Sequence, residues 1–430
     1  MRIVALTNET KQSILDDLLK RSPNNYTQYE ATVNEIIERV RTEKNKAVFD
    51  YTLQFDKFAL TPENIKVTRA EIEEAYTKLD ADLIEVIKQS AENIRTFHMK
   101  QLRNSWFDSK EDGTILGMKI TPIEKAGVYV PGGKAAYPSS VLMNVIPAKV
   151  AGVGQIIMTT PPGADGKVNP GTLVAADIAG VDTIYKVGGA QAIAAMAFGT
   201  ESIPKVDKIT GPGNIFVALA KKAVYGYVSI DSIAGPSEIL VLADETANPR
   251  YVAADLLSQA EHDELASAIL VTTSKELAEQ VSVEVDKFVQ ELSRTEIMQK
   301  SLDNYGYILV ADSMTDAIDA ANAIASEHLE ILTKNPFDTM TRIRNAGAIF
   351  LGEYASEPLG DYFAGPNHIL PTNGTAKFFS PVNVDDFIKK TSIISYSREA
   401  LEKVHKNIER FAESEGLTAH ANSIKVRFED

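Results

Sequence analysis

Apolar residues repeat at helical spacing through roughly the first hundred positions. Residues 30–55 and 81–102 carry apolar side chains near the 3.6-residue period, which predicts amphipathic helices. Thr68 and Glu71 have the spacing of a capping box at the start of a further helix. We expect a helical region over residues 1–110, part of it packing with the second of two α/β modules that follow. His98 lies inside the second helix and is predicted to be a surface or half-buried residue.

From about residue 115 the pattern changes to short apolar runs that alternate with alanine-rich helical ones. This rhythm starts again near residue 236 and is typical of βαβ units around a parallel sheet. The fold class is therefore α/β, with two Rossmann-like parallel-sheet modules over residues 115–235 and 236–380. Residues 381–430 are predicted to form a small helical C-terminal extension.

Composition narrows the function classes. The 430 residues carry a formal net charge of −15, which disfavours nucleic acid as a partner. The chain contains no cysteine, so disulfides, thiolate metal sites and a cysteine nucleophile are excluded. The N-terminus lacks the pattern of a signal peptide, and the most apolar stretch, VLMNVIPAKVAGVGQIIM, reads as a buried helix running into a strand. We expect a cytoplasmic protein without membrane association.

Three glycine-rich loops follow candidate strands of the first module. They contain Pro131, Gly132 and Gly133; Gly188, Gly189 and Gln191; and Gly211, Pro212, Gly213 and Asn214. Such loops let a ligand approach the backbone and offer a helix N-terminus to an anion. They are either tight βα turns or the edge of a cofactor cleft where strands end. No GxGxxG fingerprint follows a strand, so a dinucleotide would bind by a variant arrangement.

Histidine is scarce, with six residues in the chain. Gln259 and His262 share one helix face at i, i+3, Asp361 lies in a glycine-containing loop, and His420 lies near the C-terminus. Nitrogen and oxygen ligands of this kind suit Zn²⁺, and Mn²⁺ or Co²⁺ also fit. The spacing by itself is equally typical of an ordinary surface helix.

Glu327 and His328 are adjacent, near the predicted end of a helix that runs into LEIL. Neighbours on a helix point apart, so we expect them to serve two different proton transfers. The alternative is a helix end at which a charged histidine meets the negative pole. His405 lies in an amphipathic run and is predicted to be a surface residue.

Taken together, these motifs resemble the histidinol dehydrogenase family over nearly the whole chain. The matching strings, in the family's order, are GVYVPGG, VGGAQAIAAMAFGT, KITGPGN, AGPSE, LLSQAEHD, SEHLEI, GDYFAGPNHILPT and EGLTAHA. The resemblance implies NAD-dependent oxidation of L-histidinol to L-histidine through an aldehyde, the last step of histidine biosynthesis. It also implies one zinc ion per subunit and a homodimer with shared active sites, in which the C-terminal extension contacts the partner subunit.

The resemblance also implies roles for individual residues, each at a position that matches the family's motif. The implied zinc ligands are Gln259, His262, Asp361 and His420. The implied acid/base pair is Glu327 and His328. Besides His328 and the metal ligands, the implied substrate contacts are Ser237, His368 and Glu415. The implied nucleotide contacts are Tyr129, Gln191 and Asn214.

Two other functions remain open from the sequence. A paralogous metal- and NAD-dependent dehydrogenase would oxidise another small amino or sulfonated alcohol. A noncatalytic two-lobed protein would bind its ligand in a cleft, but it would have lost the Glu327–His328 dyad or the ligand set, and both are present here.

Overall fold

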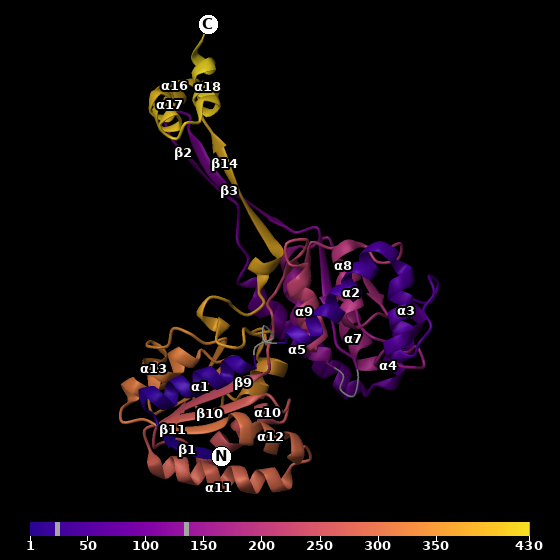
Figure 1. The fold of residues 1–430 in the computed structure, drawn as a ribbon, viewed down its shortest axis with the longest axis vertical. Helices are drawn as coiled ribbons and strands as arrows, with labels where there is room; N and C mark the ends of the chain where they lie inside the picture. Colours follow the sequence, from indigo (N-terminus) through magenta and orange to yellow (C-terminus); the bar gives the residue numbers. More distant parts are fainter. Residues whose placement is uncertain (22–25, 133–136, 430) are drawn as a thin grey trace. The chain divides into compact units, whose positions relative to one another are not determined.

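A computed structural model describes residues 1–21, 26–132 and 137–429. The chain forms two compact units, each built from segments that are distant in sequence (Figure 1). The larger unit comprises Met1–Gln101 and Ile123–Phe387, and the smaller one comprises Leu102–Pro122 and Ile388–Asp430. The larger unit contains the two parallel sheets that the sequence predicts, so the α/β fold class is confirmed.

The first sheet has five parallel strands in the order β6-β5-β4-β7-β8. Its strands are β4 (Lys125–Tyr129), β5 (Gln155–Thr159), β6 (Thr183–Tyr185), β7 (Lys208–Thr210) and β8 (Ser229–Ile230). One face packs against α2 (Thr27–Glu43), α3 (Asn45–Asp56), α8 (Gly189–Phe198) and α9 (Ile215–Val224). The other packs against α4 (Arg69–Lys78), α5 (Ala81–Met99), α6 (Pro138–Ala151) and α7 (Pro170–Ala179).

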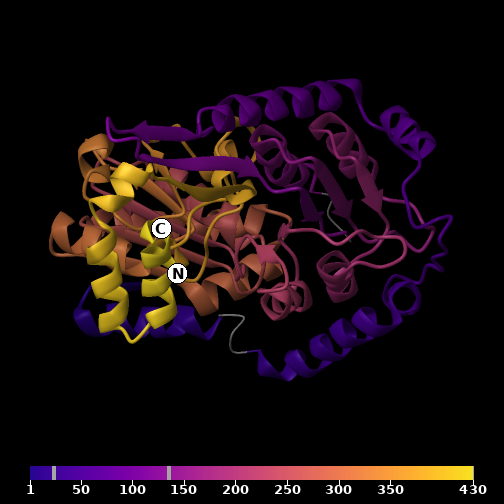
Figure 2. The same cartoon turned by 90° about the horizontal axis from the view of Figure 1, so that it is seen from above.

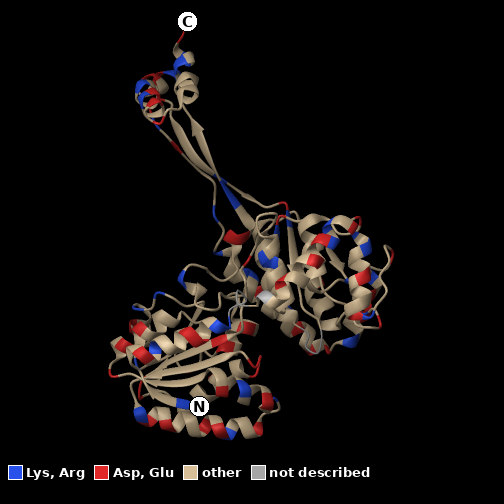
Figure 3. Cartoon of the chain, in the orientation of Figure 1, with Lys and Arg blue, Asp and Glu red and all other residues tan. Residues whose placement is uncertain are grey.

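The second sheet has six parallel strands in the order β1-β11-β10-β9-β12-β13. They are β1 (Arg2–Ala5), β9 (Glu238–Ala243), β10 (Ser267–Thr272), β11 (Gly306–Val310), β12 (His328–Leu332) and β13 (Ala348–Leu351). On one face lie α1 (Asn8–Lys20), α13 (Met314–Ile324) and α14 (Pro336–Met340). On the other lie α10 (Pro249–Ala260), α11 (Lys275–Glu291) and α12 (Thr295–Tyr305). Charged residues gather on the helices and loops, while the central strands are almost free of them (Figure 3).

The N-terminal region is shared between the two sheets. Strand β1 pairs in parallel with β11, and Ile14 and Leu18 of α1 enter the core of the second sheet. The next helices, α2 and α3, pack on the first sheet. Strand β1 was not predicted, because its four residues are mostly exposed and carry no two-residue alternation.

The smaller unit combines an antiparallel sheet with three helices. The sheet has the order β14-β3-β2, with β2 (Trp106–Ser109), β3 (Ile115–Pro122) and β14 (Ile388–Ser395). The helices are α16 (Arg398–Glu402), α17 (His405–Ser414) and α18 (Thr418–Lys425), and the last two lie side by side (Figures 1 and 2). The sequence predicted the helices and missed β14, whose residues are mostly exposed.

Several local predictions are confirmed, and one is wrong. Thr68 and Glu71 form the capping box at α4, and the apolar stretch forms α6 followed by β5. No described helix has both the length and the apolar character needed to cross a membrane. His98 is fully buried, not on the surface, because α5 presents it to Asn367, whose amide lies 3.5 Å from its Nε2.

Candidate active site

The glycine-rich loops of the first sheet meet at the carboxyl ends of its strands. β4 and β7 are neighbours, and the loops after β4, β6 and β7 lead into helices. The Gly189 backbone N–H donates to the Tyr129 hydroxyl over 3.1 Å. Gly211 lies against the Tyr129 carbonyl oxygen at a φ of +123°, which leaves no room for a side chain. The expected convergence of the loops is present; Gly133 lies outside the described residues.

The three predicted nucleotide residues differ in their surroundings. Tyr129 and Gln191 are buried, and burial raises the pKa of the Tyr129 phenol to about 12. The Gln191 Oε1 atom is buried with no hydrogen-bond partner among the described residues. Asn214 is exposed and caps α9, because its side chain accepts hydrogen bonds from the N–H groups of Phe216 and Val217. Its position at a helix N-terminus suits an anionic ligand.

A buried ion pair holds the loop between β7 and α9. Lys221 on α9 pairs with Asp231, which follows β8, and both side chains are almost completely buried. The Lys221 ammonium donates to the Gly211 carbonyl over 2.9 Å. The Gly211 N–H donates to the Asp231 carboxylate over 2.8 Å. The pair therefore holds both polar groups of one glycine in the predicted nucleotide loop.

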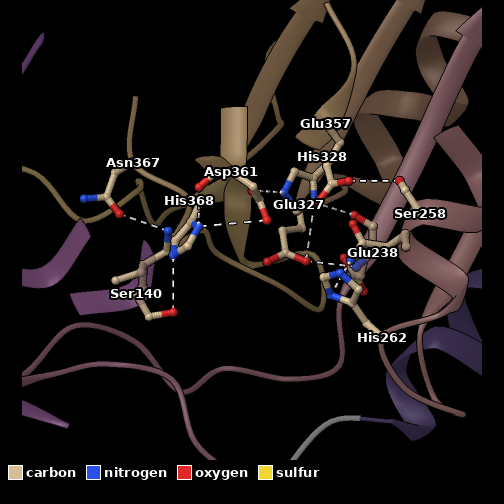
Figure 4. A network of polar contacts seen from close by, with 12 residues as sticks. Ser140, Glu238, Ser258, His262, Glu327, His328, Glu357, Asp361, Asn367 and His368 are labelled. Carbon is tan, nitrogen blue, oxygen red and sulfur yellow. Dashed lines mark hydrogen bonds and ion pairs between the residues drawn. The ribbon is translucent and has the colours of Figure 1, made fainter. Parts of the chain in front are cut away.

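Glu327 and His328 lie at the amino ends of strands in the second sheet (Figure 4). The prediction that they end a helix is wrong: α13 stops at Ile324, Ala325 turns left-handed, and His328 begins β12. The Glu238 N–H donates to the Glu327 carboxylate over 2.9 Å. His328 Nδ1 donates to the Glu238 carbonyl over 3.0 Å, because a carbonyl only accepts. His328 Nδ1 and Glu327 Oε2 are 3.6 Å apart, so the two side chains are not directed apart as helix geometry predicted.

Burial and nearby charges shift the pKa values of this pair. Desolvation raises the pKa of Glu327 to about 8. For His328, burial alone would lower the pKa, but the nearby carboxylates of Glu327 and Asp361 outweigh it and raise the pKa. The shared neighbour Glu238 is itself fixed, because its buried carboxylate accepts a hydrogen bond from Arg21 over 2.6 Å. Glu327 and His328 are therefore both held by Glu238, a buried residue that is itself fixed by Arg21.

Asp361 joins this pair to a second group of polar side chains. Its carboxylate lies 3.6 Å from His328 Nε2 and 3.9 Å from His368 Nδ1. His368 Nδ1 also donates to the Asp361 carbonyl over 3.1 Å. Gln259 lies in the last turn of α10, and its amide Nε2 lies 3.3 Å from His262 Nδ1. The Gln259 Oε1 and His328 Nε2 atoms are both buried without partners among the described residues.

Two unpartnered lone pairs beside a carboxylate suit a cation. Gln259 Oε1, an imidazole and a carboxylate form an N/O donor set that fits a divalent metal. A tighter group consists of His328, Glu357 and Asp361, whose ligand atoms all lie within 4.8 Å of one another. Both groups contain Asp361. The sequence interpretation missed Glu357, although its i, i+4 spacing from Asp361 across a helical segment was a usable signal.

Comparison with known proteins identifies the family. The model of the family described as histidinol dehydrogenase matches residues 19–428. The histidinol dehydrogenase of Bacillus subtilis is 59% identical over 410 residues, covering 95% of this chain and 96% of that one. The enzyme of Clostridium acetobutylicum is 57% identical over 397 residues, or 92% of each chain. The chain belongs to the histidinol dehydrogenase family.

The fold agrees with a solved member of this family. The crystal structure of histidinol dehydrogenase from Elizabethkingia anophelis has a TM-score of 0.94, with 39% sequence identity, and covers 99% of this chain and 98% of that one. The predictions of an oxidoreductase, and of an enzyme of the last step in histidine biosynthesis, are thereby confirmed.

Of three further residues that the family resemblance singles out, Ser237 is the chain neighbour of Glu238, whereas Glu415 and His420 belong to the smaller unit. Ser237 directly precedes β9, and its carbonyl accepts a hydrogen bond from the Ser267 N–H over 3.0 Å. Glu415 ends α17, and His420 lies in α18. Both are exposed on the smaller unit. His405, by contrast, is partly buried and pairs with Glu409 over 2.8 Å.

Proposed function

We propose that this chain oxidises L-histidinol to L-histidine through L-histidinaldehyde, with two NAD⁺ consumed and one Zn²⁺ bound per subunit. The observation that carries the proposal is the buried His328, whose Nδ1 is committed to a carbonyl and whose Nε2 has no partner among the described residues. With the Nδ1–H held by the carbonyl, Nε2 is the nitrogen that can take the alcohol proton, and a zinc ion held at Asp361 would offset the carboxylate charge that raises the pKa of His328.

His328 removes the hydroxyl proton in the first oxidation. The Glu238 carbonyl holds the Nδ1–H, so the lone pair on Nε2 is the one available to the substrate. The same nitrogen serves again when the hydrated aldehyde loses its second hydride. Loss of the alcohol proton and loss of the hydride leave the C=O bond of the aldehyde.

Glu327 activates the water that hydrates the aldehyde. Dehydrogenases that work through a thiol would form a thiohemiacetal at this stage, and this chain has no cysteine. Glu327 is a carboxylate whose pKa burial raises to about 8, and proton exchange with water is easiest for a group that titrates near neutral pH. Water adds to the carbonyl carbon, and Glu327 takes the proton that the water loses.

The proposed cofactor ligands are residues of this chain. Gln259, His262, Asp361 and His420 would hold the zinc ion, and Tyr129, Gln191 and Asn214 would contact the nucleotide. When bound, NAD⁺ accepts the hydride of each oxidation, and Zn²⁺ supplies a positive charge that orients the nitrogen atoms of the substrate. The unpartnered Gln259 Oε1 supports the zinc assignment, and the unpartnered Gln191 Oε1 supports the nucleotide assignment.

Three further residues would bind the substrate. Glu415 is a carboxylate of the right sign for the substrate ammonium group, and Ser237 and His368 supply hydrogen-bonding groups. His368 is oriented by its bond to the Asp361 carbonyl, and the Ser140 hydroxyl lies 3.4 Å from its Nε2. These contacts fix the carbinol carbon relative to His328.

A homodimer would complete each site with the exposed Glu415 and His420 of the other subunit. Mixing two inactive variants tests this arrangement. A 1:1 mixture of His420→Asn and His328→Asn chains should recover roughly a quarter of the parent activity, because half of the dimers are mixed and each has one intact site. No recovery after verified subunit exchange would mean that His420 serves its own chain.

The test of the reaction itself is a count of NADH formed per L-histidinol consumed by the zinc-loaded protein. We expect two NADH per L-histidinol. A chelator should abolish the formation of NADH, and added zinc should restore it. One NADH would mean that oxidation stops at the aldehyde and that the Glu327 role is wrong. None, with zinc bound, would favour a paralogue substrate, for which a competition assay among small amino and sulfonated alcohols is the next measurement. We also propose the cytoplasm as its compartment.

A further inference from the structure

Asp56 is a half-buried carboxylate that the proposed mechanism does not use. It is the last residue of α3, and its Oδ2 atom is buried with no partner among the described residues. Burial raises the pKa of its carboxyl group to about 6. A negative charge at the carboxyl end of a helix also opposes the helix dipole. Two unfavourable features at one residue indicate a task other than stability.

The sequence of α3 explains why Asp56 is directed inward. Val48, Thr52 and Asp56 are spaced i, i+4 and i+8, so they share one helix face, and the first two are fully buried. This face belongs to the core that α3 shares with α8 and the first sheet. Asp56 therefore extends a buried stripe to the end of the helix.

The direction of α3 brings Asp56 towards the start of α8. At the other end of α3, Lys44 donates to the Gly199 carbonyl over 3.1 Å and the Asn45 N–H donates to Glu201 over 3.0 Å. Gly199 and Glu201 follow the last turn of α8, so the amino end of α3 lies beside the carboxyl end of α8. The two helices are also of similar length, about 18 and 15 Å at 1.5 Å per residue. After burial, the charge of Asp56 also helps to raise the pKa of the Tyr129 phenol, whose hydroxyl accepts a hydrogen bond from the Gly189 N–H at the start of α8.

Near the start of α8, two hydrogen-bond acceptors therefore lack a donor. Asp56 Oδ2 and Gln191 Oε1 are both buried and unpartnered among the described residues. A ligand with neutral hydroxyl groups would satisfy them, whereas a second anion would be repelled by Asp56. Ribose hydroxyls have this chemistry, and dinucleotide sites often receive a ribose diol on a carboxylate.

We propose that Asp56 accepts a hydrogen bond from a ribose hydroxyl of the nucleotide and thereby selects NAD over NADP. A 2′-phosphate would bring its negative charge against the carboxylate. The inference rests on the proposed function, since it concerns the same nucleotide site, but it adds a residue outside the three glycine-rich loops.

The test compares Asp56→Asn and Asp56→Ala with Asp50→Asn. Asp50 lies on the same helix but is exposed and pairs with Lys46 over 3.0 Å, so it is a matched control for charge. The dissociation constants of NADH and NADPH are measured by nucleotide fluorescence on the zinc-loaded protein. Thermal unfolding and zinc content are recorded in parallel.

Asp56→Ala should weaken NADH binding about 10-fold or more, since it removes a charged hydrogen-bond acceptor. Asp56→Asn should narrow the preference for NADH over NADPH about 10-fold by removing the repulsion, with a melting temperature equal to or above the parent's. Asp50→Asn should change neither nucleotide constant. If the parent binds NADH and both Asp56 variants keep its preference, or lose both nucleotides equally with a lower melting temperature, the inference is wrong. If the parent itself binds no NADH, the proposed function fails first.

Discussion

The two parallel sheets of the larger unit use opposite edges. The first sheet presents its loops at the carboxyl ends of β4, β6 and β7, where α8 and α9 begin. The second sheet presents Glu238 and His328 at the amino ends of β9 and β12, and α13 ends just before β12. Under the proposed function, the general rule that ligands bind beyond the carboxyl ends of strands would hold for the first sheet and not for the second.

The difference follows from the charge of the proposed ligands. Helix N-termini have partial positive charge and suit the phosphates of a nucleotide. The carboxyl end of α10, where Gln259 lies, has partial negative charge and suits a cation. The comparison teaches that one fold type serves an anion or a cation according to which edge it presents.

The largest effect is expected for His328→Asn, at the amino ends of the strands of the second sheet. Asparagine can still donate to the Glu238 carbonyl but has no basic nitrogen, so kcat for both oxidations should fall about 10⁴-fold. Rapid-mixing measurements with histidinol and with histidinaldehyde separate the two steps. The dissociation constants of zinc and NADH serve as controls and should stay near the parent values; a variant that kept even a tenth of the parent rate would remove His328 from the chemistry.

A smaller effect is expected for Asp231→Asn, and it should be confined to the nucleotide loops of the first sheet. It leaves the buried Lys221 without its counter-charge, which should lower the free energy of unfolding by about 3 kcal/mol. Because both partners hold Gly211, NADH affinity should also drop while zinc affinity does not. Urea unfolding and zinc titration check this. Lys222→Met is the control, because Lys222 pairs with Glu30 on the half-exposed side of the same helix; equal losses in the two variants would contradict the role of the pair.

Glu327→Gln should separate the two half-reactions. Aldehyde oxidation should slow about 100-fold, and alcohol oxidation less, because only the aldehyde needs an activated water. Single-turnover rates starting from each substrate give the ratio. Parent-like oxidation of histidinaldehyde by this variant would reassign the base.

The smallest expected effect distinguishes the two metal groupings around Asp361. Glu357→Gln should weaken zinc binding about 10-fold as a neighbour of the ligands, and His262→Asn should weaken it more. Competition with a fluorescent chelator measures both constants. The reverse order would favour the group of His328, Glu357 and Asp361 as the metal site. Parent-like zinc affinity in His420→Asn would remove His420 from the ligand set.

Local signals in the sequence predicted most of the fold. The alternation of strands and helices, the glycine-rich loops and the capping box at Thr68 each depend on a few neighbouring residues. Strands β1 and β14 escaped prediction because they are short or exposed and are defined by partners far away in the chain. The burial of His98 depends on Asn367, some 269 residues later, and has no local signal.

The site was predictable only in part for the same reason. Motif resemblance singled out His328 and Asp361, but the Glu327–His328 geometry was misjudged because a strand start was taken for a helix end. The contacts of Lys221 with Asp231 and of Glu238 with Arg21 arise from tertiary packing. From the sequence alone these residues look like ordinary surface charges, and only the folded structure shows that they are buried pairs.

Strand β1 has a consequence for the synthesis of the chain. Arg2–Ala5 pairs with residues 307–310, so this strand waits for roughly 300 further residues to be translated before it finds its partner. At ribosomal speeds of about 5–20 residues per second this delay is about 15–60 s. During that interval α1 lacks most of the surface on which Ile14 and Leu18 are buried. The second sheet is therefore completed at its edge by a strand made long before its partner, and a holding chaperone would find its target there.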